Sequence, residues 1–161
     1  MKMPVRIKSL FPVLFAVVTA AALSACSLFE DEKPAYVEKP VDELYNRGVD
    51  MMTGRRFVDS ARTFEEVERQ HPYSVWATKA QLMAAYGYYK SNNYQEAISA
   101  LDRFIQLHPT NPDVGYAYYL KGLAYYEQIS DVTRDQQMTT LALQSLKEVV
   151  TRFPDSKFAR D

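Results

Sequence analysis

Residues 56–72, RFVDSARTFEEVERQHP, share their pattern with residues 93–109, NYQEAISALDRFIQLHP, which lie 37 positions further along the chain. Phe64 falls on Leu101 and Val67 falls on Phe104 in this comparison. The apolar residues recur every three or four positions, which predicts one buried helical face. Both segments end in His-Pro, and proline commonly follows the end of a helix. A repeated helical unit is therefore the first expectation for this chain.

The pattern extends to both sides of this segment. Gly48, Ala85 and Gly122 occupy one shared position upstream, where a small residue allows a partner helix to approach closely. A third unit ends at Phe153-Pro154, and its eight extra residues are assigned to a longer loop around residues 130–136. Each unit is therefore interpreted as two antiparallel helices.

Polar residues mark the predicted helix starts. Ser74, Asn111 and Ser156 each stand two residues after a unit-ending proline and are predicted N-caps. Asn93 and Glu96 have the spacing of a capping box for the second helix of their unit. No stretch alternates as a strand would, so an all-α fold is predicted.

The shared small, aromatic, alanine and proline positions resemble a tetratricopeptide repeat, lengthened from its usual 34 residues. The predicted fold is an α-solenoid of tetratricopeptide-like hairpins at about 41–72, 74–109 and 111–154, with the start of a fourth repeat at 156–161. The repeat domain as a whole is placed at 41–161. Ordinary helical hairpins are the alternative, which agreement across three units disfavours.

Residues 1–25 have the organisation of a secretory signal. Lys2, Arg6 and Lys8 precede an apolar run from Leu10 to Leu23, which is shorter than the ~20 residues of a bilayer span. The run ends in LSAC at 23–26, which resembles the bacterial lipobox and predicts lipid on Cys26. A transmembrane anchor and an ordinary cleavage site are the alternatives. Residues 26–40 are then a lipidated, flexible tether that spans at most about 50 Å.

Composition excludes several classes of function. The formal net charge is −1, and it becomes −4 once the three basic residues of the signal are removed, which argues against nucleic-acid binding. One cysteine and two histidines leave little material for a metal site. We find no nucleophile elbow, P-loop or dinucleotide fingerprint. The sequence therefore predicts no enzyme activity and no cofactor.

A groove is the predicted binding site, because the first helices of stacked pairs line a concave surface. Tyrosine suits peptide recognition, since it combines a large apolar area with a hydroxyl group. The competing interpretation is that these rings pack against the next repeat. The predicted groove residues are Tyr86, Tyr89, Tyr116, Tyr119, Leu123 and Tyr126, and Leu82 falls on the same face.

A lipobox followed by these repeats resembles the BamD lipoproteins of the outer-membrane β-barrel assembly machine. The resemblance runs from Cys26 to the end of the chain and includes loop residues that a generic repeat would not share. The stretches that carry it include HPYS at 71–74, AYGYYK at 85–90, DRFI at 102–105, HPTNP at 108–112 and FPDS at 153–156.

The resemblance implies a non-enzymatic lipoprotein on the periplasmic face of the outer membrane. It implies BamA, accessory Bam lipoproteins and unfolded outer-membrane proteins as partners. In lipoproteins of this pattern, an aspartate directly after the lipidated cysteine favours retention in the inner membrane. This chain has Ser27 at that position, so outer-membrane localisation is expected. The alternative functions are a pilotin-like, lipid-anchored adaptor of another envelope machine and a cell-wall hydrolase that carries repeats.

Overall fold

The computed structural model describes residues 38–129 and 136–161. The predicted signal, Cys26, most of the predicted tether and nearly all of the predicted long loop lie outside these residues. Residues 38–161 form one compact unit, to which the description below refers.

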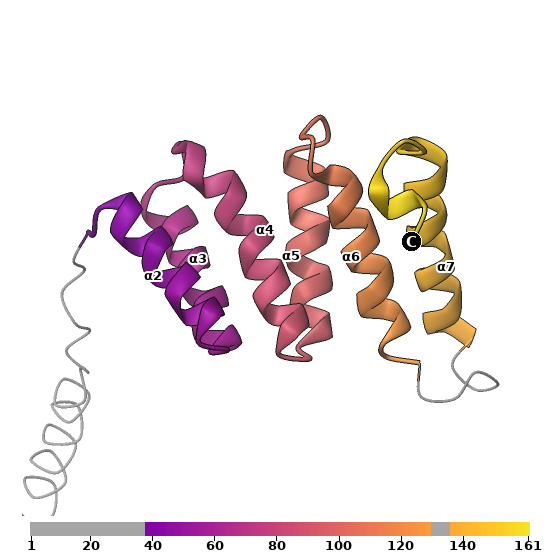
Figure 1. The fold of residues 1–161 in the computed structure, drawn as a ribbon, viewed down its shortest axis with the longest axis horizontal. Coiled ribbons are helices and arrows are strands. Elements are labelled where there is room, and N and C mark those ends of the chain that lie inside the picture. Colours follow the sequence, from indigo (N-terminus) through magenta and orange to yellow (C-terminus); the bar gives the residue numbers. More distant parts are fainter. Residues whose placement is uncertain (1–37, 130–135) are drawn as a thin grey trace, which may run out of the picture. The chain divides into compact units, whose positions relative to one another are not determined.

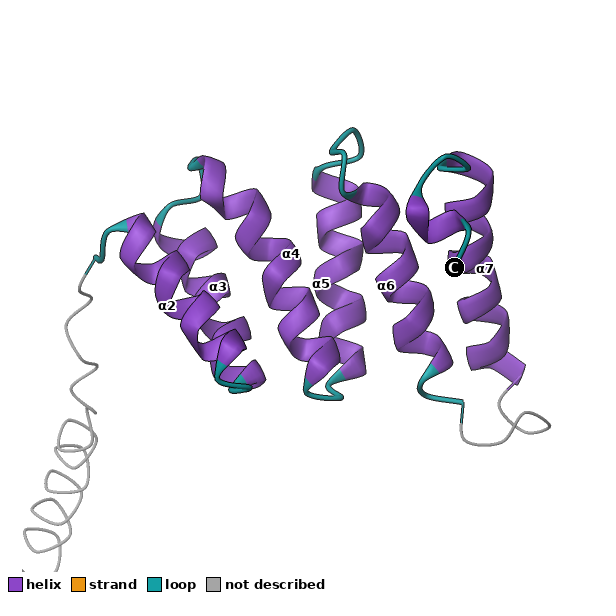
Figure 2. Cartoon of the chain, in the orientation of Figure 1, coloured by secondary structure: helices purple, strands orange, loops and turns teal. Residues whose placement is uncertain are grey.

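All regular secondary structure in the described ranges is helical, as Figure 2 shows. The elements are α2 (Val41–Thr53), α3 (Phe57–Gln70), α4 (Val75–Lys90), α5 (Tyr94–Leu107), α6 (Val114–Tyr126), α7 (Gln136–Arg152) and the 3₁₀ helix η3 (Lys157–Ala159). Each helix packs on the next one along the chain, and α2 and α6 also contact α4 (Figure 1). The predicted all-α solenoid of helical hairpins is confirmed.

The small residue of each unit lies against a large apolar residue of the second helix. A Cβ atom at Gly48 would lie 2.8 Å from Cε1 of the Phe64 ring, and one at Gly122 would lie 2.6 Å from Cδ2 of Leu146. In the second unit, Ala85 belongs to the same buried cluster as Leu101. The repeat therefore pairs a small residue on its first helix with a large apolar residue on its second.

The turn between paired helices has the same geometry in the first two units. The N–H of Arg56 donates to the Met51 carbonyl at 2.8 Å, and the N–H of Asn93 donates to the Tyr88 carbonyl at 2.9 Å. The preceding residues, Arg55 and Asn92, have left-handed φ values of 59° and 62°. This is the Schellman arrangement that commonly ends helices.

Two of the predicted N-caps are confirmed. The Ser74 hydroxyl accepts the N–H of Ala77 at 3.1 Å, and the Ser156 hydroxyl accepts the N–H of Ala159 at 3.2 Å. Ser156 opens the short 3₁₀ helix η3.

The other two capping predictions are wrong. The Asn111 side chain accepts the N–H of Asp113 at 2.8 Å and so closes the turn before α6, whose first residue is Val114. Asn93 precedes α5 without a side-chain cap, because its ψ is 68° rather than the extended 152° of Ser74. An N-cap side chain reaches the first turn from an extended backbone.

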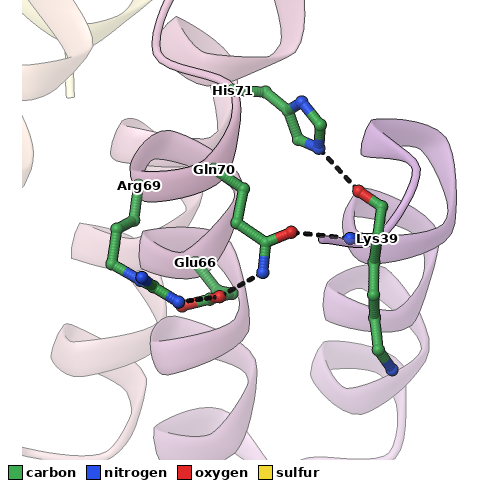
Figure 3. A network of polar contacts seen from close by, with 5 residues as sticks. All are labelled: Lys39, Glu66, Arg69, Gln70 and His71. Carbon is green, nitrogen blue, oxygen red and sulfur yellow. Dashed lines mark hydrogen bonds and ion pairs between the residues drawn. The ribbon is translucent and has the colours of Figure 1, made fainter. Parts of the chain in front are cut away.

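A polar network holds the segment before α2 against the end of α3 (Figure 3). The N–H of Lys39 donates to Gln70 Oε1 at 2.8 Å, and His71 Nε2 lies 2.6 Å from the Lys39 carbonyl oxygen. A carbonyl only accepts, so Nε2 carries the proton. Glu66 accepts hydrogen bonds from Gln70 and Arg69 and so orders the Gln70 amide. The chain therefore enters the repeats beside His71.

Candidate peptide-binding groove

The first helices of the three pairs form one side of the repeats, since α4 contacts both α2 and α6 (Figure 1). All the predicted groove residues lie on α4 and α6. Tyr126 is exposed, and the other predicted residues are half-buried: Tyr86, Tyr89, Tyr116, Tyr119 and Leu123. Half-buried rings contact the core on one side and present their remaining surface to solvent.

Tyr86 and Tyr116 line a shared pocket of about 380 Å³ beside α4. Tyr45 of α2 also lines it, so three consecutive first helices contribute to one cavity. Burial raises the pKa of Tyr116 to about 12, and the neighbouring Tyr86 hydroxyl adds to the shift. The other lining residues are Lys79, Leu82, Met83 and Asp113.

The pocket has a structural explanation in the repeat register. Tyr45, Leu82 and Tyr119 occupy one repeat position, and Trp76, Asp113 and Phe158 occupy another, at the start of the following unit. The Trp76 ring lies 4.6 Å from the Tyr45 ring, centroid to centroid. At the third junction, the Phe158 ring stacks on Tyr119 at 5.3 Å. An aromatic ring from the next unit therefore covers the groove at both outer junctions.

The middle junction lacks this ring. Asp113 stands where the other junctions have tryptophan or phenylalanine, and its register partner is Leu82 rather than a tyrosine. Both residues line the pocket. The cavity thus lies at the position that an aromatic side chain fills in the neighbouring junctions.

Tyr89 does not line the pocket, although its hydroxyl interacts electrostatically with those of Tyr86 and Tyr116. Its ring centroid is 5.9 Å from that of Tyr94 on α5. Its pKa is raised first by burial and then by the carboxylate of Glu127, which follows α6. Tyr89 therefore continues the tyrosine surface from the pocket toward Tyr94 and Glu127.

Tyr119 is covered by residues from the end of the chain. Besides stacking on Phe158, its hydroxyl donates a hydrogen bond to the Asp161 carboxylate. This hydrogen bond is the main reason that its pKa is raised to about 12. At Tyr119, packing against the next unit is the interaction that the structure shows.

Leu123 and Tyr126 follow Tyr119 at helical spacing on α6. Tyr126 is 61% exposed and lines a separate cavity of about 430 Å³, together with Leu143 and Leu146 of α7. The structure therefore brings Tyr86 and Tyr116 together, and it places Tyr126 at a second site.

Within the described ranges, no helix combines the length and apolar character needed to cross a bilayer. In the same residues, no group of three or more histidine, cysteine, aspartate or glutamate side chains is placed to hold a metal ion. The pocket itself is lined by aromatic and apolar side chains together with one cation, Lys79, and one anion, Asp113.

A family model described as "Outer membrane lipoprotein", YfiO, matches residues 37–161, which include every helix described above. The chain belongs to the YfiO family.

Curated proteins similar to this YfiO family member are named outer membrane protein assembly factor BamD. The protein from Caulobacter vibrioides is 45% identical over 148 residues, which are 91% of this chain and 48% of that protein. The protein from Rickettsia prowazekii is 38% identical over 144 residues, which are 89% of this chain and 57% of that protein. The protein from Neisseria meningitidis serogroup B is 33% identical over an alignment of 162 positions, which covers 92% of this chain and 61% of that protein. The chain thus spans about half of the length of these relatives.

Sequence reasoning about this YfiO family member did not identify four of the residues that line the pocket: Tyr45, Lys79, Met83 and Asp113. The repeat register carries a signal for Tyr45, because Tyr45 is the repeat equivalent of Leu82 and of Tyr119. Asp113 gave no signal as a residue type. Asp113 matters because it stands at the position where Trp76 and Phe158 place an aromatic ring at the other two junctions.

Proposed function

We propose that this chain acts as a non-enzymatic, lipid-anchored component of the outer-membrane β-barrel assembly complex. The YfiO description as an outer membrane lipoprotein and the name of the BamD relatives as assembly factors support this role. The groove binds extended segments of unfolded barrel proteins and so supports their insertion. BamA and accessory Bam lipoproteins are the partner subunits.

The anchoring proposal divides the N-terminal region into two parts. Residues 1–25 are a signal that is removed, and residues 26–40 are the tether whose first residue, Cys26, carries the lipid. Several acyl chains on one cysteine provide firm anchoring, because each buried CH₂ contributes about 0.8 kcal/mol. The repeats then lie on the periplasmic side of the outer membrane.

The observation that carries the groove proposal is the pocket at the middle junction. Its register equivalents hold Trp76 against Tyr45 and Phe158 against Tyr119. A site of this shape and composition suits an aromatic side chain supplied by another polypeptide. Strands of outer-membrane barrels carry aromatic girdles at both membrane interfaces, so an unfolded barrel protein presents such side chains in extended segments.

Filling the pocket from within is expected to block peptide binding. The Asp113→Trp variant supplies the ring that the other junctions have, and it removes no cap because the Asp113 side chain caps no helix. We expect a barrel-strand peptide with a terminal aromatic residue to bind at least about tenfold more weakly, the loss typical of a central aromatic contact. Fluorescence anisotropy with labelled peptide measures this.

Asp113→Asn is the matched control, because it removes the charge and leaves the space open. Its affinity should stay close to that of the wild type. A second variant, Tyr86→Ala/Tyr116→Ala, should weaken the peptide while helicity is retained. Wild-type affinity in Asp113→Trp would place peptide binding outside this pocket.

Affinity purification of the full-length, membrane-anchored protein tests the assembly role. We expect BamA and accessory Bam lipoproteins to be recovered with it from detergent-solubilised outer membranes. Recovery of pilus or secretion-system components in their place would support the adaptor function instead. Hydrolysis of peptidoglycan by the purified protein would contradict the non-enzymatic role.

A further inference from the structure

The turn between α3 and α4 exposes two apolar side chains next to each other. Tyr73 is fully exposed, and Val75 is 83% exposed, the largest values for large hydrophobic residues in the part of the chain that the structure describes. Trp76 follows them and is 36% exposed, with its ring against Tyr45. We call Tyr73, Val75 and Trp76 the first corner.

The repeat fold does not require apolar residues at the two most exposed positions. The register equivalents of Tyr73 are Thr110 and Asp155, and those of Val75 are Pro112 and Lys157. All three corners make the same backbone turn, in which the N–H of the third residue after Ser74, Asn111 or Ser156 donates to the carbonyl of that residue at 3.0–3.2 Å. The first corner therefore gains nothing in folding from its exposed apolar surface.

The first corner adjoins the point at which the predicted tether reaches the repeats. Gln70 and His71 hold Lys39 through the two hydrogen bonds drawn in Figure 3. Tyr73 follows His71 by two residues. Covalent geometry keeps Lys39 within about 50 Å of a lipid on Cys26, which raises the effective concentration of the bilayer at this corner.

We propose that the first corner inserts Tyr73 and Val75 into the interfacial region of the bilayer that holds the lipid anchor. The inference rests on the proposed lipidation of Cys26. Tyrosine and tryptophan are the residues that favour the membrane interface, where the ring is buried and the polar group stays hydrated. The corner acts as a second contact, which fixes the orientation of the repeats relative to the membrane.

The charges around the corner permit this insertion. Residues 72–78 contain no charged side chain, so burial in the interface desolvates no charge. Lys79, which also lines the pocket, is the first charged residue after the corner, and its Nζ lies 5.7 Å from the centroid of the Trp76 ring. Two acids lie near the corner: Glu38, whose Oε1 is 4.0 Å from His71 Nδ1, and Glu43 of α2, which pairs with Lys39 at 3.6 Å. Insertion is therefore driven by apolar contact rather than by net charge.

Trp76 is the only tryptophan in the chain and reports directly on this contact. The lipoprotein is purified from membranes and reconstituted into vesicles of phosphatidylethanolamine and phosphatidylglycerol, with or without bromine on the acyl chains. We expect brominated vesicles to quench Trp76 emission. The Tyr73→Ser/Val75→Ser variant should lose this quenching while its far-ultraviolet circular dichroism stays unchanged.

Leu143→Ser/Val150→Ser is the matched control. These residues of α7 are 66% and 56% exposed, so the variant removes similar apolar surface at a distance from the corner in sequence. It should be quenched like the wild type. Equal quenching of the corner variant and the wild type, or no quenching of the wild type, would overturn the proposal.

The experiments distinguish failure of the proposed lipid anchor from failure of the proposed membrane insertion of the first corner. A membrane-bound protein whose Trp76 is not quenched contradicts the corner alone. If the N-terminus proves unmodified, the anchor proposal fails, and the single cysteine is coupled to a maleimide lipid so that the same quenching still decides the corner. Loss of a co-purifying protein in the corner variant, without any quenching of the wild type, would assign the corner to a protein partner.

Discussion

Replacing Cys26 by serine is expected to move the protein from the membrane fraction to the soluble fraction. Even one myristoyl chain binds membranes with a constant of about 10⁴ M⁻¹, and a lipobox cysteine receives several chains. The first corner alone offers two exposed apolar side chains, which is too little surface to retain the protein without the lipid. Fractionation followed by mass spectrometry of the mature N-terminus measures both effects.

Ser27→Asp provides the control for this prediction. It leaves Cys26 in place, so the protein should remain membrane-bound, and the lipoprotein sorting pattern predicts its retention in the inner membrane. An unmodified Cys26 in membrane-extracted protein would contradict the anchor. So would a Cys26→Ser protein that stays in the membrane fraction.

The second large effect is expected in the core, at the pair formed by Gly48 and Phe64. Phe64 has no exposed surface, and its ring lies 5.2 Å from the Tyr45 ring. Phe64→Ala should lower the free energy of unfolding by about 3–5 kcal/mol, because the cavity that it leaves adds to the lost burial. Chemical denaturation measures the change.

The second repeat has a larger residue in place of Gly48 and a smaller one in place of Phe64, so it suggests a pair of substitutions that compensate each other. Its equivalents are Ala85 and Leu101, which are both fully buried. Gly48→Ala alone places a Cβ atom 2.8 Å from the Phe64 ring and should cost about 1–3 kcal/mol through overpacking. Phe64→Leu alone leaves unfilled space. The double variant Gly48→Ala/Phe64→Leu should be more stable than the sum of the two changes predicts, since residues in contact are coupled.

If the two single changes in unfolding free energy simply add in the double variant, the smaller side chain at position 64 does not make room for the new methyl group at position 48. The control is Gly115→Ala, in which the new Cβ atom meets the half-buried Phe153 ring at 3.2 Å. That ring can shift, so Gly115→Ala should destabilise less than Gly48→Ala. A larger loss at Gly115 would contradict the argument from buried contacts.

Residue types at fixed spacings determined much of the fold. Ser74 and Ser156 could be assigned as caps because a hydroxyl group before an apolar run satisfies a free N–H of the first turn. The same argument failed at Asn93, where the backbone angle is imposed by the preceding left-handed turn at Asn92. A cap depends on the local backbone as well as on the residue type.

The candidate site was predictable only in part. Tyr86 and Tyr116 could be placed on the groove face from helical spacing, and the structure brings them to one pocket. Tyr119 has the same spacing, yet Phe158 and Asp161 cover it. Helical periodicity identifies the face of a residue, but it does not show which side chain of the next unit lies above it.

The sequence by itself determined the helices, the repeat register and the small residue that the three units share at Gly48, Ala85 and Gly122. These follow from short-range spacing, because side chains three or four residues apart share a helix face. Only the tertiary structure decided that residue 76 of one unit covers residue 45 of the unit before it, and hence that Asp113 leaves a pocket. That relation depends on how consecutive hairpins are offset when they stack, and the packing of all their side chains together sets this offset.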